Sequence, residues 1–364
     1  MALGGCHVIL PLAPAPPSPE AHGAVDALLT DGAGDGQQGD GVAEAGDVVL
    51  LLLETSTQNI GGLHAFDLLT RKELDTYSIS LDNGGDFGMT ADGSQLVLAN
   101  GEEGEVQVLK VWEGKSVNFV PENMVDIGHA SRQLALHPKV DTAYVQVYDQ
   151  VVAVDLKTMK KGSVIWTGND GITEIGVLSG GDRVLVGTWM TGGLHFVDPQ
   201  SATTVGMVTN LGAVSTFVLT SDDAFAYCIS KWNDNLYTVR LGSSPALQQT
   251  VTLSFQPFGL ALTRDNRELV VHGGKSLVHY ALDSSGAPKT PGNTIALSCT
   301  KKPEQDNEQL SLALSPDGKV AVAACHGEPK VAIVELAPGK ESAVKTLLPG
   351  TEAVLGIMIR EVGE

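Results

Sequence analysis

The feature that most constrains this chain is a turn signature that recurs along most of its length. Each copy begins with two apolar residues separated by one residue of any type. A polar tight turn and a second β-strand follow. The residues that precede the turn are Met89, Leu136, Leu178, Leu219, Leu262 and Leu314. Successive copies are 47, 42, 41, 43 and 52 residues apart. Four-stranded propeller blades repeat at about 40–45 residues, so the spacing predicts an all-β propeller.

Each copy continues in the same way after its turn. A second strand follows, as in 95–99 and 183–187, and then a third strand that ends in an acidic or polar residue. Asp155, Asp198 and Asp283 follow third strands. An aspartate there can open a turn by accepting hydrogen bonds from the backbone about two residues on, so we predict a structural role for these residues.

The two ends of the repeat region complement each other. Residues 47–82 supply three strands without an innermost one, and 354–359 supply a lone strand with the innermost pattern. We therefore expect seven blades over 47–364, with the C-terminal strand closing the ring in the first blade. Closure leaves only short, protected strand edges. The apolar run at 48–53 is expected to be a buried strand.

Residues 1–46 differ from the rest of the chain. Five prolines lie between Pro11 and Pro19, and 31–46 are mainly Gly, Asp, Ala and Gln. Such a segment buries too little to offset its chain entropy, so we expect it to be disordered or loosely attached. Residues 2–19 contain no Lys or Arg, so a signal peptide would lack its positive region. The expectation is a soluble protein, cytoplasmic rather than secreted.

Two of the copies resemble a known family. The stretch 312–318, Leu-Ala-Leu-Ser-Pro-Asp-Gly, is followed by a short strand, and the strand at 95–100 ends in Ala-Asn. These features resemble the YVTN-type repeats of lactonase-like seven-bladed propellers, over about residues 47–362. The resemblance implies the fold. That group includes sugar-lactone hydrolases, surface-layer proteins and propeller subunits of redox enzymes, so several functions are compatible with it.

The charge balance limits the partners. The chain has 43 acidic and 23 basic residues, a formal net charge of −20. Nucleic-acid binders need a basic surface, and anionic membranes attract basic ones, so neither partner is expected. No apolar run reaches the roughly 18 residues that a membrane helix needs. The charge suits solubility or a cationic partner.

The four cysteines suggest no metal or redox motif. Cys6, Cys228, Cys299 and Cys325 are far apart, and none forms a C-x-x-C pair. The sequence predicts reduced, partly buried thiols.

Propeller geometry predicts which face carries function. The loops from outer to next inner strand share a face with those between second and third strands, and these loops hold the chemically versatile side chains. The candidate ligand-binding residues on this face are Asp86, His129, Arg132, Asp170, Glu174, Trp189, Lys231, Trp232, His272, Glu308 and His326.

Several roles remain open for these side chains. The three histidines could converge on a divalent metal, although no ligand spacing supports this, and no cofactor is predicted. Asp170, Glu174 and Glu308 could form an acid/base pair, or cap turns. Arg132 is expected to pair with Glu174 or another carboxylate near the axis, or to bind an anion. The two tryptophans could form an aromatic rim for a ligand or peptide, or close the packing of their blades.

The leading functional hypothesis is a non-catalytic platform that presents this face to a protein or small ligand. The alternatives are a lactonase-like hydrolase with carboxylates and a histidine near the axis, and a propeller subunit of a redox enzyme. The chain has no Walker loop, no G-x-G-x-x-G and no nucleophile elbow.

Overall fold

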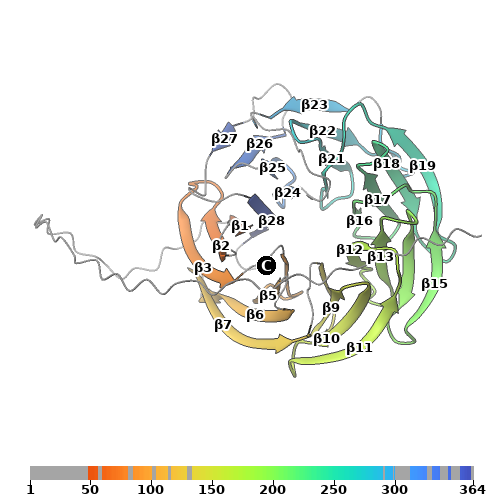
Figure 1. The fold of residues 1–364 in the computed structure, drawn as a ribbon. Coiled ribbons are helices and arrows are strands. Elements are labelled where there is room, and N and C mark those ends of the chain that lie inside the picture. The colour runs from red at the N-terminus through yellow and green to blue at the C-terminus, as the bar shows by residue number, and fades with distance from the viewer. Residues whose placement is uncertain are drawn as a thin grey trace, which may run out of the picture. The chain divides into compact units, whose positions relative to one another are not determined.

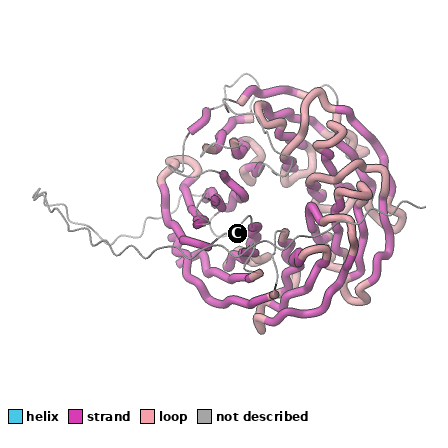
Figure 2. The backbone as a smooth tube through the Cα atoms, in the orientation of Figure 1, coloured by secondary structure: helices cyan, strands magenta, loops and turns pink. Residues whose placement is uncertain are grey.

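The structure is a computed structural model of the chain. It describes residues 48–55, 60–80, 85–100, 104–113, 116–128, 133–289, 292–297, 299, 312–325, 330–336, 343–345 and 353–361. These residues form seven four-stranded antiparallel sheets arranged as the blades of a ring (Figure 1). The tube view shows strands and loops throughout the described chain (Figure 2). The predicted all-β, seven-bladed propeller is therefore confirmed.

Every blade has one innermost and one second strand. The innermost strands are β28 (Ala353–Glu361), β4 (Gly85–Met89), β8 (Leu134–Leu136), β12 (Ile172–Val177), β16 (Thr216–Leu219), β20 (Gly259–Leu262) and β24 (Leu312–Leu314). The second strands, in the same blade order, are β1 (Val48–Thr55), β5 (Gln95–Asn100), β9 (Thr142–Val147), β13 (Val184–Thr188), β17 (Phe225–Ser230), β21 (Glu268–His272) and β25 (Val320–Ala324). We number the blades 1 to 7 in this order.

The outer half of each blade contains the other two strands. The third strands are β2 (Ile60–Asp67), β6 (Glu105–Glu113), β10 (Gln150–Asp155), β14 (Leu194–Asp198), β18 (Asn235–Arg240), β22 (Ser276–Ala281) and β26 (Val331–Glu335). The outermost strands are β3 (Glu73–Ser80), β7 (Ser116–Asp126), β11 (Lys160–Thr167), β15 (Thr203–Val208), β19 (Ala246–Thr252), β23 (Asn293–Ala296) and β27 (Ala343–Lys345).

The C-terminal strand closes the ring as predicted. β28 pairs antiparallel with β1, with Leu50 opposite Ile359 and Leu52 opposite Ile357. β28 also contacts β24 and β4, the innermost strands of the two neighbouring blades. Figure 1 shows β28 and β1 at the inner side of the ring. The first blade is therefore built from both ends of the propeller sequence, which joins blade 7 to blade 2.

The core consists of layers between blades. Most buried apolar side chains of the described residues fall into seven clusters, and each cluster joins two neighbouring blades. On β1, Leu50 and Leu52 pack towards blade 7, whereas Leu51 and Leu53 pack towards blade 2. Alternate residues of a strand point to opposite faces, so a strand between two blades needs apolar residues at every position. This explains the continuous apolar run at 48–53.

The turns after the third strands confirm the structural role of their aspartates. Asp155 Oδ1 accepts hydrogen bonds from the backbone N–H groups of Lys157 and Thr158, both at 2.9 Å. Asp198 makes the same contacts with Gln200 and Ser201. These bonds lower the pKa of both carboxylates, since they stabilise the charged form.

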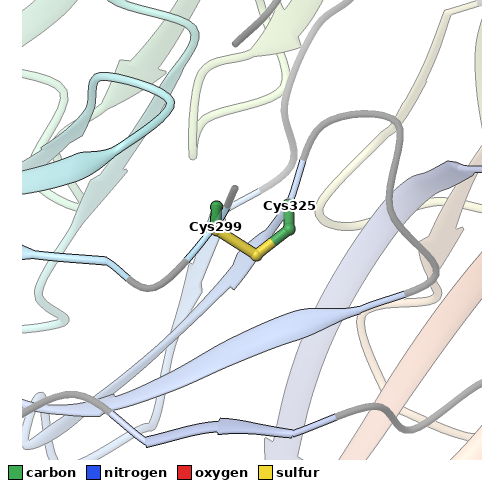
Figure 3. The surroundings of a disulfide bond; sticks show 2 residues. All are labelled: Cys299 and Cys325. Atoms are coloured by element: carbon green, nitrogen blue, oxygen red, sulfur yellow. A yellow bond between two sulfur atoms is a disulfide. The ribbon is translucent and has the colours of Figure 1, made fainter. Parts of the chain in front are cut away.

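The prediction for the cysteines was wrong for one pair. Cys299 and Cys325 form a disulfide, with their Cα atoms 5.4 Å apart (Figure 3). Both lie in the apolar layer between blades 6 and 7. The two residues are 26 positions apart, and only the blade packing brings them together. Cys228 is a buried free thiol whose pKa burial raises to about 12, as expected for an inert core cysteine.

Other predictions concern residues outside the described ranges. The N-terminal segment 1–46, which includes Cys6, is among these residues, so the predicted disorder of this segment stays a prediction. No helix in the described part of the chain is long and apolar enough to cross a membrane.

Candidate functional site

The described loops of blades 3 to 5 meet on the predicted face. Trp189, after the second strand of blade 4, donates its backbone N–H to the carbonyl of Gly171, which precedes that blade's innermost strand. Val214, which precedes the innermost strand of blade 5, donates its backbone N–H to the carbonyl of Thr188 at the end of the second strand of blade 4. The loops between second and third strands therefore lie beside those that lead into innermost strands, which is the arrangement expected from the sequence.

Trp189 and Trp232 come from equivalent loops of neighbouring blades and stack on each other. Their ring centroids are 6.3 Å apart and their planes differ by 30°. About half of each residue remains exposed, 47% for Trp189 and 51% for Trp232. Met190 beside them is 66% exposed, and Lys231 Nζ lies 5.8 Å from the centre of the Trp232 ring. We call Trp189, Met190, Lys231 and Trp232 the tryptophan patch.

Hydrogen bonds hold the loops that carry the tryptophan patch. Met190 N–H donates to Asp170 O at 3.1 Å, and Thr191 Oγ1 donates to the Asp170 carboxylate at 3.0 Å. On the second loop, Lys231 N–H donates to Ser215 Oγ at 3.0 Å, and Gln256 Nε2 donates to Lys231 O at the same distance. These bonds fix both loops to segments that lead into innermost strands: Asp170 and Ser215 precede the innermost strand of the same blade, and Gln256 precedes that of the next blade.

Gly171 allows Trp189 to take this position. Gly171 has a φ of +64°, in the left-handed region that glycine adopts at little cost. A Cβ at this position would collide with the indole of Trp189. Because Gly171 has no side chain, the indole of Trp189 can pack directly against its backbone.

Asp86 is held between two innermost strands. Its carboxylate accepts a hydrogen bond from Phe87 N–H at 2.8 Å and another from Leu134 N–H, on blade 3, at 2.9 Å. The protein packed around the carboxylate nevertheless raises the pKa of Asp86 to about 6, because loss of water disfavours the charged form more than the two bonds stabilise it. The side chain keeps some solvent exposure.

Glu174 links the next pair of blades in a similar way. Thr216 Oγ1 of blade 5 donates to Glu174 Oε2 of blade 4 at 2.8 Å. The predicted partner Arg132 lies outside the described residues, so the pairing of Arg132 with Glu174 stays a prediction. His129, Glu308 and His326 also lie outside the described ranges.

His272 is the last residue of β21 and is completely buried. Neither ring nitrogen makes a well-formed hydrogen bond to the described residues. Burial lowers the pKa of His272 to about 4, although the backbone of Gly274 opposes the shift. Val270, two residues earlier, packs in the layer between blades 6 and 7, so His272 faces the same layer. It therefore does not share the solvent-exposed surface of the tryptophan patch.

The structure thus separates the candidates. The tryptophan patch contains three of the candidates, Trp189, Lys231 and Trp232, and Asp170 is hydrogen-bonded to its first loop. Asp86 and Glu174 instead connect innermost strands. Within the described residues, no group of three or more His, Cys, Asp or Glu side chains is arranged to hold a metal ion. The sequence does not predict Thr216 and the Leu134 backbone as the partners of the two carboxylates. Each partner lies on the innermost strand of the next blade, one residue closer to the turn than the carboxylate in the repeat alignment, and only this proximity could have indicated the pairing.

Comparisons with known proteins identify the fold. No family model matches the chain, and no curated protein matches its sequence. A functionally unknown protein from Desulfotomaculum acetoxidans is similar in structure, with a TM-score of 0.71 and 12% identity over 87% of this chain and 99% of that one. The periplasmic gluconolactonase PpgL of Pseudomonas aeruginosa has a TM-score of 0.68 and 14% identity, over 86% and 99%.

A third similar structure is the hydrazine synthase of Kuenenia stuttgartiensis. It has a TM-score of 0.54 and 15% identity, over 69% of this chain and 76% of that one. At such low identities these similarities establish the β-propeller fold alone, because this fold carries unrelated functions.

Proposed function

We propose that this protein is a non-catalytic binding platform that presents the tryptophan patch to a protein or small ligand. The observation that carries the proposal is the exposed, stacked pair Trp189 and Trp232. Tryptophan and methionine are enriched at binding interfaces and tryptophan dominates their energetics. The patch is held by backbone hydrogen bonds, so little conformational entropy would be lost on binding.

The proposal assigns no cofactor to the site and excludes two classes of partner. A net charge of −20 opposes both nucleic acid and anionic membrane surfaces. The disulfide between Cys299 and Cys325 favours an oxidising compartment. This departs from the cytoplasmic location expected from the N-terminal sequence, and it is part of the proposal.

Tryptophan fluorescence tests the platform. Purified protein is titrated with three defined probes: an arginine-containing peptide, a glutamate-containing peptide and cellohexaose. Binding of at least one probe by the wild type, with loss of binding in the Trp189→Ala/Trp232→Ala variant, supports the proposal. The control variant Met124→Ala removes an apolar side chain that is 55% exposed on the outer strand β7, away from the patch, and should bind normally. Failure of all three probes contradicts the proposal.

A lactonase-like hydrolase is the second candidate, and Asp86 is the observation that favours it. A carboxylate near the axis with a pKa of about 6 is suited to proton transfer near neutral pH. As a general base, Asp86 would take a proton from the water that attacks a lactone carbonyl. Hydrolysis of δ-gluconolactone that rises with pH through about 6, and that Asp86→Asn abolishes, would establish this candidate and displace the platform.

A further inference from the structure

The tryptophan patch has the composition of the centre of a protein interface. Trp189, Met190 and Trp232 expose large apolar side chains on adjoining loops. By contrast, Trp166 is buried in the layer between blades 3 and 4. The loops around the patch are rich in Thr, Ser, Asn and Gly, with Asp170 and Asp234 among them. An apolar centre with a polar rim that includes carboxylates is typical of sites that receive a large side chain from a partner.

The chain itself shows which kind of side chain the patch accepts. The ammonium group of Lys231 lies over the Trp232 ring, 5.8 Å from its centroid. The face of an indole ring carries partial negative charge and attracts cations, with tryptophan the strongest of the aromatic residues. Arginine is better suited than lysine to such a face, because its planar guanidinium group can stack on the ring and also donate to a carboxylate.

The net negative charge of the chain also favours a basic partner. Two copies of a chain with a net charge of −20 repel each other, which opposes self-association through this face. A basic segment is attracted by that field. Asp234 follows Trp232 by two residues on the same loop. Asp170 lies on the segment that leads into β12 and is hydrogen-bonded to Met190 and Thr191 of the Trp189 loop. One carboxylate is therefore on, or bonded to, each of the two loops.

We propose that the tryptophan patch docks an arginine-containing basic segment of a partner protein, whose guanidinium group stacks on Trp232 or Trp189 in place of the Lys231 ammonium. This inference rests on the proposed platform function and names its ligand class. In the free protein Lys231 occupies the position that the arriving arginine takes, so the lysine competes with the partner.

The test uses the full chain and a fluorescein-labelled, capped heptapeptide that alternates glycine and arginine. Matched peptides carry lysine or glutamate in place of arginine, and cellohexaose is the neutral probe. Fluorescence anisotropy and tryptophan emission give the affinities. The arginine peptide should bind most tightly. Trp232→Ala or Trp189→Ala should weaken it by roughly tenfold, the effect of one partly desolvated cation–π contact. Met124→Ala should leave it unchanged, and added salt should weaken it.

Lys231→Met gives the sharpest discrimination. If Lys231 competes with the arginine, its removal should tighten arginine-peptide binding several-fold. If the patch instead binds an acidic ligand through Lys231, the same variant weakens binding, which overturns the inference. The variant keeps the two backbone hydrogen bonds of Lys231, which accepts from Gln256 through its carbonyl and donates to Ser215 through its N–H.

The outcomes separate this inference from the platform proposal. Patch-dependent binding of the glutamate peptide or cellohexaose, without binding of the arginine peptide, overturns the inference and leaves the platform standing. No patch-dependent binding of any probe overturns both. Arginine-peptide binding that both tryptophan substitutions leave unchanged also overturns the inference, because the peptide then binds elsewhere on the acidic surface.

Discussion

Asp86 and His272 are expected to make opposite contributions to the pH dependence of stability. The pKa of Asp86 rises from its ordinary 3.8 to about 6 in the fold, and the pKa of His272 falls from 6.5 to about 4. The folded protein therefore binds a proton at Asp86 more tightly than the unfolded chain does. At His272 it binds a proton less tightly. Each difference is linked to the free energy of unfolding.

The signs and sizes follow from these two shifts. The stability linked to Asp86 is fully present below pH 3.8 and is lost as the pH rises through about 6. The stability linked to His272 is present above pH 6.5 and is lost as the pH falls towards 4. At about 1.4 kcal/mol per pKa unit, the contribution is at most about 3 kcal/mol for Asp86 and about 3.5 kcal/mol for His272. In the wild type the two nearly cancel between pH 7 and 4, so single substitutions should reveal them.

The assay is urea unfolding followed by intrinsic fluorescence from pH 7.5 to 4. Relative to the wild type, Asp86→Asn should become less stable on acidification, by up to about 3 kcal/mol, because the variant lacks the stability that protonation of Asp86 adds to the folded state. His272→Leu should become more stable on acidification by a similar amount. Met124→Ala should show a constant difference. If the Asp86→Asn difference does not change with pH, the argument from burial of this carboxylate is refuted.

Three further predictions concern contacts between loops and blades. Replacing both Cys299 and Cys325 by serine should lower the unfolding free energy by about 3–4 kcal/mol, since the bond closes a loop across 26 positions. Equal urea midpoints for this variant and the wild type would contradict that. Gly171→Ala should cost about 1–3 kcal/mol and shift the tryptophan emission, because its φ is +64° and the new Cβ displaces Trp189. Gly206→Ala, which has ordinary contacts, is the control, and an equal thermal shift in both variants would refute the reasoning. Thr216→Val should cost about 1–3 kcal/mol by removing the donor to Glu174, whereas Thr204→Val on the exposed face of β15 should have little effect. Similar melting temperatures for the two threonine variants would show that the bond between blades 4 and 5 contributes nothing.

The blade architecture can be predicted from the sequence. The recurring turn signature set the blade length, and the incomplete first blade together with the lone strand at 354–359 predicted the closure that β28 makes. The run at 48–53 indicated a buried strand. The aspartates after the third strands indicated turns. These features could be read because a strand's alternation and a turn's hydrogen bonds depend on residues close together in the sequence.

The contacts between blades become visible only in the folded protein. The stacking of Trp189 on Trp232 depends on how two neighbouring blades are rotated about the ring. The pairing of Cys299 with Cys325 depends on the packing of blade 6 against blade 7, and so does the burial of His272. Asp86 has a raised pKa because protein surrounds its carboxylate. Each of these properties arises from residues that lie in different repeats or from the complete packing around a site, and no local pattern in the sequence records that packing.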